Sequence, residues 1–249
     1  MATSGTSSKT SESTASSGGG GRILGIDVGG SHIKLAVVDH GGAPVDQPAR
    51  MDTPVGNPPE AIVDAIAELA RPLPAYDRIS VGFPGVVRDG VVLTAPNLGN
   101  EGWHRFDLAG ALTRRLGKPA RVLNDADMQG LAVIRGRGLE MIITLGTGFG
   151  TGLYLDGHLL PHLEIAHTRF RKGETYDERL GNAARKKVGD KKWTRRVEKA
   201  IEDMRRLVHF DHLHLGGGNA KRLALEPSPD ISIVDNEAGI EGGAHAWRD

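Results

Sequence analysis

Asp27-Val28-Gly29-Gly30-Ser31-His32-Ile33-Lys34 is the stretch at which one short apolar run, residues 23–26, ends and a second, residues 33–38, begins. Residues 145–152 read Leu-Gly-Thr-Gly-Phe-Gly-Thr-Gly and again follow an apolar run. Short apolar runs bounded by glycine are typical of β-strands. A unit of strand, glycine loop and strand therefore occurs twice, which predicts two similar halves.

Helical patterns separate these units from further strands. Apolar residues from Ile62 to Ala70 recur on one face of a helix that Pro58-Pro59-Glu60 opens. Further helices are expected at 108–116, from 125 onward, over the charged stretch 177–209 with a break near Gly189, and at 237–247. Further strands are expected at 79–83, 121–123, 141–145, 212–215 and 231–234. Strands that alternate with helices indicate an α/β fold, here of two domains with a cleft between them.

Composition excludes several classes of protein. The 249 residues hold 31 Lys and Arg, 31 Asp and Glu, and no Cys, so disulfides and Cys-ligated metal sites are ruled out. A neutral balance argues against a protein dominated by nucleic-acid or membrane binding. Glycine, at 35 residues, is about twice its usual share of roughly 7%, which directs attention to backbone that approaches a ligand closely.

Residues 1–21 form a Ser- and Gly-rich tail without an apolar stretch, and we expect them to be disordered. No secretory signal or spanning run is present, so a cytoplasmic location is expected. We divide the remainder into a domain at 22–125 and a domain at 126–249, whose last helix can pack back on the first domain.

The two glycine loops suit phosphate binding. Gly29 and Gly30 let backbone N–H groups approach an anion, Ser31 adds a hydroxyl and Lys34 a charge, while Asp27 can hold Mg²⁺ through water. Such a stretch alone also fits a plain hairpin. The second loop, with Gly146, Thr147, Gly148 and Gly150, makes plain turns harder to accept, and it does not have the spacing of a Walker or dinucleotide loop.

Polar residues near these loops suit a sugar. Asp125 follows a strand at a helix start, where it fits either a general base or a helix N-cap, and the spacing leaves both open. Glu164 and His167 are three apart and can face one ligand, although a surface pair fits equally, and nearby His162 gives only weak support for zinc. Asn97 is placed to bond hydroxyl groups, or to form a turn.

In this order, the segments resemble the ROK family of sugar kinases, which have the two-domain actin-like ATPase fold. The resemblance covers about residues 22–247. It assigns residues 27–34 and 145–150 to the first two phosphate motifs, and Leu215-Gly216-Gly217-Gly218-Asn219 to the nucleotide-side motif. It implies that Asp125 is the catalytic base and that Asn97, Asn124, Glu164 and His167 bind the sugar.

Two departures refine the resemblance. Glu164-Ile165-Ala166-His167 has Ala where the family usually has Gly, and the Cys-rich zinc motif of many members is absent, so no such zinc site can form. The branch that lacks those Cys is the polyphosphate glucokinases, which residues 171–181, 191–193 and 216–221 also resemble. The resemblance thus implies a homodimeric kinase that uses Mg²⁺ and polyphosphate or ATP, or ATP alone, to phosphorylate glucose or a close hexose.

The excess of basic residues in one segment is consistent with the polyphosphate glucokinase branch. Residues 169–206 hold 14 Lys and Arg against 7 Asp and Glu, and a polyanionic donor needs a positive track, of which Lys191 and Lys192 are candidate members. A solvated helix with i,i+4 ion pairs explains the same charges. Two rival functions are a non-catalytic sugar sensor and a chaperone- or cytoskeleton-like ATPase. Only 21 polar residues precede the first strand, so we do not expect a helix-turn-helix or DNA binding.

Overall fold

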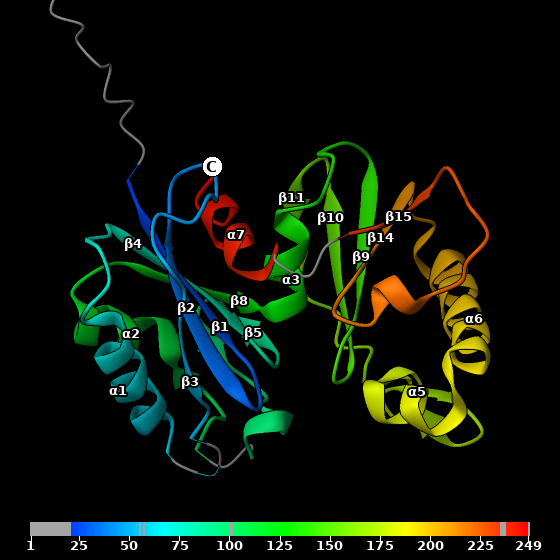
Figure 1. Cartoon of the computed structure of the whole chain (residues 1–249), viewed down its shortest axis with the longest axis horizontal. Coiled ribbons are helices and arrows are strands. Elements are labelled where there is room, and N and C mark those ends of the chain that lie inside the picture. The colour runs from blue at the N-terminus through cyan, green and yellow to red at the C-terminus, as the bar shows by residue number, and fades with distance from the viewer. Residues whose placement is uncertain (1–20, 55, 57, 100–101, 235–237, 249) are drawn as a thin grey trace, which may run out of the picture.

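The computed structural model describes residues 21–54, 56, 58–99, 102–234 and 238–248. Its chain is built around two five-stranded sheets that stand side by side (Figure 1). The expected α/β fold with two similar halves is confirmed, and each half has its own apolar core.

The first sheet has the strand order β3-β2-β1-β4-β8. Strand β1 pairs antiparallel with β2 and parallel with β4, so the first glycine loop closes the β1–β2 hairpin at one end of the sheet. The strands are β1 (Ile23–Val28), β2 (His32–Val38), β3 (Ala49–Asp52), β4 (Arg78–Phe83) and β8 (Ala120–Asn124).

The second sheet repeats this arrangement with the order β11-β10-β9-β14-β15. Strand β9 pairs antiparallel with β10 and parallel with β14, so β9 and β10 stand where β1 and β2 stand in the first sheet. The second glycine loop therefore occupies the place of the first. The strands are β9 (Leu139–Leu145), β10 (Phe149–Leu155), β11 (His158–Leu159), β14 (His212–Gly216) and β15 (Ile231–Ile233).

Helices cover the outer face of each sheet. In the first half, α1 (Pro59–Ala70) and α2 (Leu108–Leu116) bury Ile62, Ile66 and Leu112 in the core. Helix α2 has the predicted bounds; the Asp107 carboxylate caps its start, and Gly117 follows its last residue. The connections add a 3₁₀ turn, η1 (Pro96–Leu98), and a small sheet of β5 (Val87–Arg88), β6 (Val91–Val92) and β7 (Phe106–Asp107).

In the second half, the charged stretch forms helices α4 (Tyr176–Leu180), α5 (Asn182–Val188) and α6 (Asp190–Val208). Gly189, at φ 78°, separates α5 from α6, because a left-handed φ is easy only for glycine. Trp193, Val197 and Met204 of α6 pack on the second sheet. The hairpin β12 (Arg169–Arg171) and β13 (Glu174–Thr175) precedes α4, and η2 (Ala220–Arg222) follows β14.

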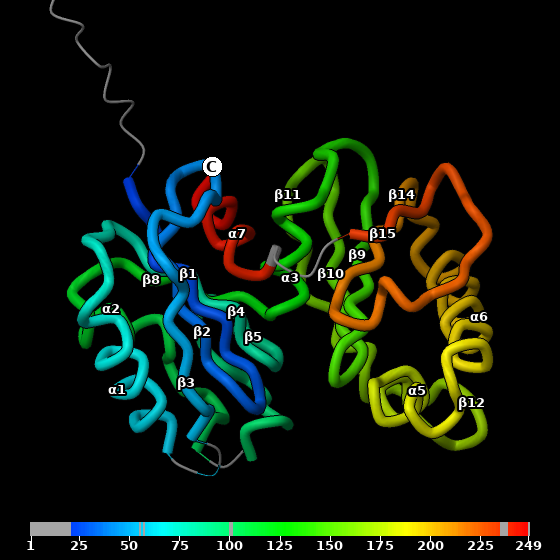
Figure 2. The backbone as a smooth tube through the Cα atoms, viewed as in Figure 1, coloured from blue at the N-terminus to red at the C-terminus, as the bar shows by residue number. Residues whose placement is uncertain are grey.

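Helices α3 (Asp125–Leu131) and α7 (Ala238–His245) lie between the two sheets. Helix α3 contacts β4 and β8 of the first sheet and β9 and β10 of the second, while α7 packs on α3, β1 and β4. The two ends of the described chain thus meet, as Figure 2 shows for β1 and α7. Trp247 Nε1 donates to Ser80 Oγ at 2.8 Å and so fastens the C-terminal segment to β4. We propose a division at residue 125, with α7 assigned in space to the first half.

Candidate active site

A cleft of about 730 Å³ lies between the two halves. It is lined by 17 of the residues that the sequence predicts for the site, and they come from both sheets and from α3. Those 17 residues are Asp27, Gly29, Gly30, Ser31, Lys34, Asn97, Asn124, Asp125, Gly146, Thr147, Gly148, Gly150, Glu164, His167, Gly217, Gly218 and Asn219.

The first glycine loop is a tight turn fixed from outside. Gly29 N–H donates to the His32 carbonyl at 2.9 Å, and Thr53 holds the turn through its hydroxyl, which donates to the Gly29 carbonyl at 2.6 Å. Asp27 and Lys34 stand opposite each other in the β1–β2 register, with Lys34 Nζ 3.9 Å from Asp27 Oδ2. The loop thus presents one carboxylate and one cation together at the edge of the cleft.

The second glycine loop is held by three residues that sequence reasoning did not connect with it or with one another. Asp177 Oδ1 accepts a hydrogen bond from Phe149 N–H at 2.8 Å. Asn182 N–H donates to the Gly146 and Thr147 carbonyls, both at 3.1 Å, and Asn219 Nδ2 donates to the Gly146 carbonyl at 3.0 Å. Since these contacts use carbonyl oxygens and one N–H, the loop has a fixed shape before any ligand binds.

The third glycine loop packs against the second. Gly217 has φ 84°, and a Cβ there would stand 2.5 Å from the Leu145 backbone nitrogen, so only glycine fits. Asn219 N–H donates to the Leu145 carbonyl at 2.9 Å. Gly216 differs from its predicted placement: it is the buried last residue of β14, pairs with Thr144, and is not among the residues that line the cleft.

The start of α3 shows whether Asp125 is the N-cap of the helix or is free to act as a general base. Asn124 is the N-cap, because its Oδ1 accepts from Ala126 N–H at 2.8 Å and Asp127 N–H at 3.3 Å. Its amide nitrogen donates to the Gly85 carbonyl at 3.1 Å. Asp125 is the first helical residue and lines the cleft, with Oδ1 accepting from Ala126 N–H at 2.8 Å. Because Asn124 caps the helix, the Asp125 carboxylate is left to face the cleft.

Desolvation at the cleft wall governs the charge of Asp125. Removal from water and the nearby Asp27 carboxylate raise its pKa to about 7, with Asp127 adding to the rise and the Ala126 N–H opposing it. Burial also raises the pKa of Asp27, against the pull of Lys34. A carboxylate whose pKa lies near neutrality in a cleft is a candidate acid–base group.

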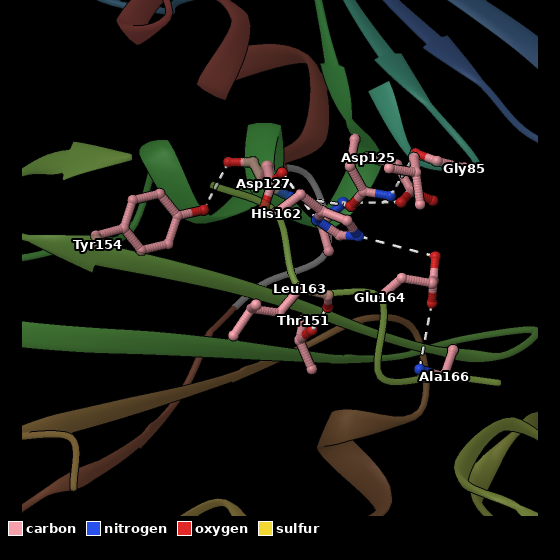
Figure 3. A network of polar contacts seen from close by, with 12 residues as sticks. Gly85, Asp125, Asp127, Thr151, Tyr154, His162, Leu163, Glu164 and Ala166 are labelled. Atoms are coloured by element: carbon pink, nitrogen blue, oxygen red, sulfur yellow. Dashed lines mark hydrogen bonds and ion pairs between the residues drawn. The ribbon is translucent and has the colours of Figure 1, made fainter. Parts of the chain in front are cut away.

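Glu164 and His167 line the same cleft from the loop after β11, and Asn97 lines it from η1 of the other half. Behind Glu164, His162 Nδ1 lies 3.0 Å from Asp127 Oδ2, and His162 Nε2 lies 3.8 Å from Glu164 Oε2 (Figure 3). Sequence reasoning considered His162 only as a metal ligand and gave Asp127 no role. The sole signal for Asp127 is its place in the run Asn124-Asp125-Ala126-Asp127.

Lys191 and Lys192 are exposed on the first turn of α6, outside the residues that line the cleft. Helix α5 connects them to it, because Asn182 at the start of α5 touches the second glycine loop. In the described part of the chain, no group of three or more His, Asp or Glu residues could hold a metal ion by itself. No helix there is long and apolar enough to cross a bilayer.

The duplicated sheets, and the cleft whose glycine loops face each other across α3, define a protein of the actin-like ATPase fold. The sequence profile of the ROK family matches residues 23–168. The chain belongs to the ROK family and is a sugar kinase of that family.

Three known proteins show which members of the family this chain is similar to. The chain is 31% identical over 240 residues to a polyphosphate glucokinase of Mycobacterium tuberculosis, covering 90% of each protein. It is similar to an inorganic polyphosphate/ATP-glucomannokinase from Arthrobacter sp. strain KM, with a TM-score of 0.79 at 32% identity over 90% of this chain and 96% of the other. A ROK family glucokinase from Streptomyces griseus in complex with glucose and AMPPNP shares the fold, with a TM-score of 0.72 at 19% identity over 91% and 99% of the chains.

Proposed function

We propose that this ROK-family kinase transfers a phosphoryl group from inorganic polyphosphate, ATP or both to the 6-hydroxyl of glucose. The observation that carries the proposal is the position of Asp125, whose carboxylate lines the cleft together with the glycine loops and with Asn97, Glu164 and His167. Two relatives, at 31% and 32% identity, are a polyphosphate glucokinase and an inorganic polyphosphate/ATP-glucomannokinase, which supports polyphosphate as a donor.

In the proposed reaction, Asp125 accepts the proton of the sugar 6-hydroxyl. The hydroxyl oxygen forms a bond to the terminal phosphorus as the bond from that phosphorus to the bridging oxygen breaks. ADP, or a polyphosphate one unit shorter, leaves with the electron pair. Because the pKa of Asp125 is raised to about 7, the carboxylate is a better proton acceptor than an ordinary Asp.

The glycine loops are proposed to hold the donor. Gly29 N–H already donates to the His32 carbonyl, and Gly146 N–H to the Gly148 carbonyl. The proposed donors to phosphate oxygens are therefore the N–H groups of Gly30, Thr147 and Gly148, with Lys34 and the Ser31 hydroxyl, all of residues that line the cleft. The third loop, Gly217–Asn219 with Gly216 behind it, lies on the nucleotide side. These donors stabilise the negative charge that the transition state carries on its equatorial oxygens.

The residues present fit Mg²⁺ bound mainly through water and donor phosphates. Mg²⁺ keeps several waters and uses one or two carboxylates, and Asp27 supplies one half-buried carboxylate beside the first phosphate loop. When bound, the ion neutralises phosphate charge. Asn97, Asn124, Glu164 and His167 are proposed to orient the sugar through its hydroxyl groups.

A matrix of initial rates tests the proposal, with long-chain polyphosphate and ATP as donors and glucose and mannose as acceptors. We expect glucose 6-phosphate from polyphosphate. A polyphosphate rate at background, with ATP active, would leave a strictly ATP-dependent hexose kinase. Glucose binding without turnover by either donor would leave a non-catalytic relative, and ATP hydrolysis indifferent to sugar would reject the sugar kinase.

A further inference from the structure

His162 connects the loop that carries Glu164 to helix α3. Its Nδ1 lies 3.0 Å from Asp127 Oδ2, and its Nε2 faces Glu164 Oε2 at 3.8 Å. Figure 3 shows the imidazole ring between the two carboxylates. Residues 35 positions apart are thus joined by one ring, so the loop and the helix cannot move independently without breaking a charged contact.

Burial separates the roles of the three side chains. Those of His162 and Asp127 are 6% and 4% exposed, whereas that of Glu164 is 30% exposed. His162 Nε2 and Asp127 Oδ1 are enclosed and have no hydrogen-bond partner within the described chain. Glu164 is therefore the most accessible of the three to a ligand, and His162, although its ring lines the cleft, has its Nε2 enclosed on the side of Glu164.

Asp127 is a fixed support for the ring. Its N–H donates to Asn124 Oδ1 at 3.3 Å, and its carbonyl accepts from the Tyr154 hydroxyl at 2.6 Å. Tyr154 is fully buried on β10. Asp127 is thereby held by the N-cap of its own helix and by the second sheet.

Glu164 has few other restraints. Its Oε1 accepts from Ala166 N–H at 3.2 Å, a contact within its own loop. The Leu163 carbonyl accepts from the Thr151 hydroxyl at 2.9 Å, which fixes the backbone but not the carboxylate. Among the described residues, His162 is the cationic partner that ties this carboxylate to another element.

We propose that His162 is a positioning residue, which holds the Glu164 carboxylate toward the sugar and fixes its loop to helix α3. The inference rests on the proposed function, in which Glu164 binds a sugar hydroxyl. A carboxylate held in place before binding loses less rotamer freedom when it accepts that hydroxyl bond, so the effect of His162 falls on sugar affinity.

The charges around the ring make this support dependent on pH. Asp127 and, more distantly, Asp125 face it from α3, the Tyr154 hydroxyl lies behind Asp127, and Glu164 and His167 belong to its own loop. Burial alone would lower the pKa of His162, but Asp127 and Glu164 outweigh burial and raise it to about 9. The ring is therefore charged below that pH and loses its proton, and its hold on one carboxylate, as the pH rises through it.

Calorimetric titration of glucose, without donor or metal, tests the inference on the full chain. In His162→Asn, a side-chain amide replaces the imidazole. The amide can still donate a hydrogen bond to Asp127, but it carries no charge and is too short to contact Glu164. We expect the glucose affinity of this variant to be weaker by about tenfold at pH 7, between the small contribution of an exposed ion pair and the larger one of a buried pair. The control is His158→Asn, an exposed histidine of β11, which should bind glucose as the wild type does.

A pH series on the wild type needs no variant. From pH 8, where Asp125 is already ionised, its glucose affinity should fall as the pH passes about 9, while that of His162→Asn should stay flat over the same range. A variant within twofold of the wild type, or a wild-type affinity unchanged up to pH 10, would overturn the role of His162 in a chain that still phosphorylates glucose. Absence of glucose binding by the wild type would instead overturn the proposed function, and this role with it.

Discussion

The carboxylate of Asp177 accepts the backbone N–H of Phe149 at 2.8 Å, across 28 positions of sequence. Asp177 lies in the first turn of α4, and Phe149 is the first residue of β10, within the second glycine loop. The bond turns an acidic residue toward a loop proposed to bind phosphate. Its value is structural, because it fixes the loop from the side away from β9.

Replacement of Asp177 by Ala should loosen this loop and raise the KM for the phosphoryl donor. Loss of a hydrogen bond to a charged group is worth about 1.5–3 kcal/mol, so we expect an increase of about tenfold or more. The KM for glucose should change little, because the side chains proposed to bind the sugar belong to other segments of the chain. Steady-state kinetics with each substrate varied in turn checks this, with Asp203→Ala on α6 as control. An equal rise in both KM values would contradict the prediction.

Asp125→Asn should remove activity without harming the fold. Loss of a general base costs about 10²–10⁴ in rate, to be measured as kcat at saturating substrates. The folded pKa of Asp125 lies above its ordinary value of 3.8, so ionisation of Asp125 destabilises the folded chain increasingly between about pH 4 and 7. The variant should therefore melt at least as high as the wild type at pH 8, and the difference should vanish near pH 4. Near-wild-type kcat would show that Asp125 is not the base.

The pH profile of kcat/KM should rise through about pH 7, since Asp125 must be ionised to accept a proton and its pKa is about 7. The negative charge of Asp27 contributes to that pKa. Asp27→Asn should therefore lower the pKa of Asp125 and shift the rising limb to lower pH, in addition to lowering the rate at its plateau. Profiles of both proteins, measured with the same donor at constant ionic strength, compare the two limbs. If the rising limb of Asp27→Asn lies at the same pH as that of the wild type, the group that titrates in the profile is not Asp125.

The duplicated fold could be predicted because glycine loops and apolar strands are local signals. The glycine loops at residues 27–34 and 145–152 mark the ends of the strands on either side of them. The helix at Leu108–Leu116 matches its predicted bounds. Much of what supports the site could not be predicted, because His162 meets Asp127, and Asp177 meets Phe149, only after the chain has folded. Hairpin β12–β13, with strands of 3 and 2 residues, is too short for a periodic pattern.

Neutralisation of Lys191 and Lys192 should weaken the binding of polyphosphate but not that of ATP. Both are exposed at the start of α6, beyond α5 as seen from the second glycine loop. A seven-residue helix is about 10 Å long, so a long anionic chain that leaves the cleft along α5 would pass them, whereas bound ATP would not extend so far. Lys191→Gln with Lys192→Gln should raise the KM for long-chain polyphosphate several-fold and leave that for ATP unchanged. Arg114→Gln with Lys118→Gln, on and just after α2, is the matched control, and equal effects on both donors would reject the track.

The glycines of the second loop differ in what they are needed for, and alanine substitutions should divide them. A Cβ at Gly148 would stand 2.0 Å from Asp177 Oδ1, and one at Gly150 would stand 2.4 Å from Thr144 Oγ1, so both positions are small because the protein itself fills the space. A Cβ at Gly146 would meet nothing within 4 Å, and Gly146 lines the cleft. The space beside Gly146 is thus available to a ligand.

Gly146→Ala should therefore fold with a melting temperature close to that of the wild type and lose donor affinity, because its methyl group enters the space proposed for phosphate. Gly148→Ala should melt several degrees lower, because Asp177 must turn away and release Phe149 N–H, a cost of about 1–3 kcal/mol. Melting curves and the KM for the donor, taken together, distinguish the two effects. A Gly146→Ala protein with normal donor KM would mean that phosphate does not approach this backbone, and the donor would then have to lie nearer to the first and third loops.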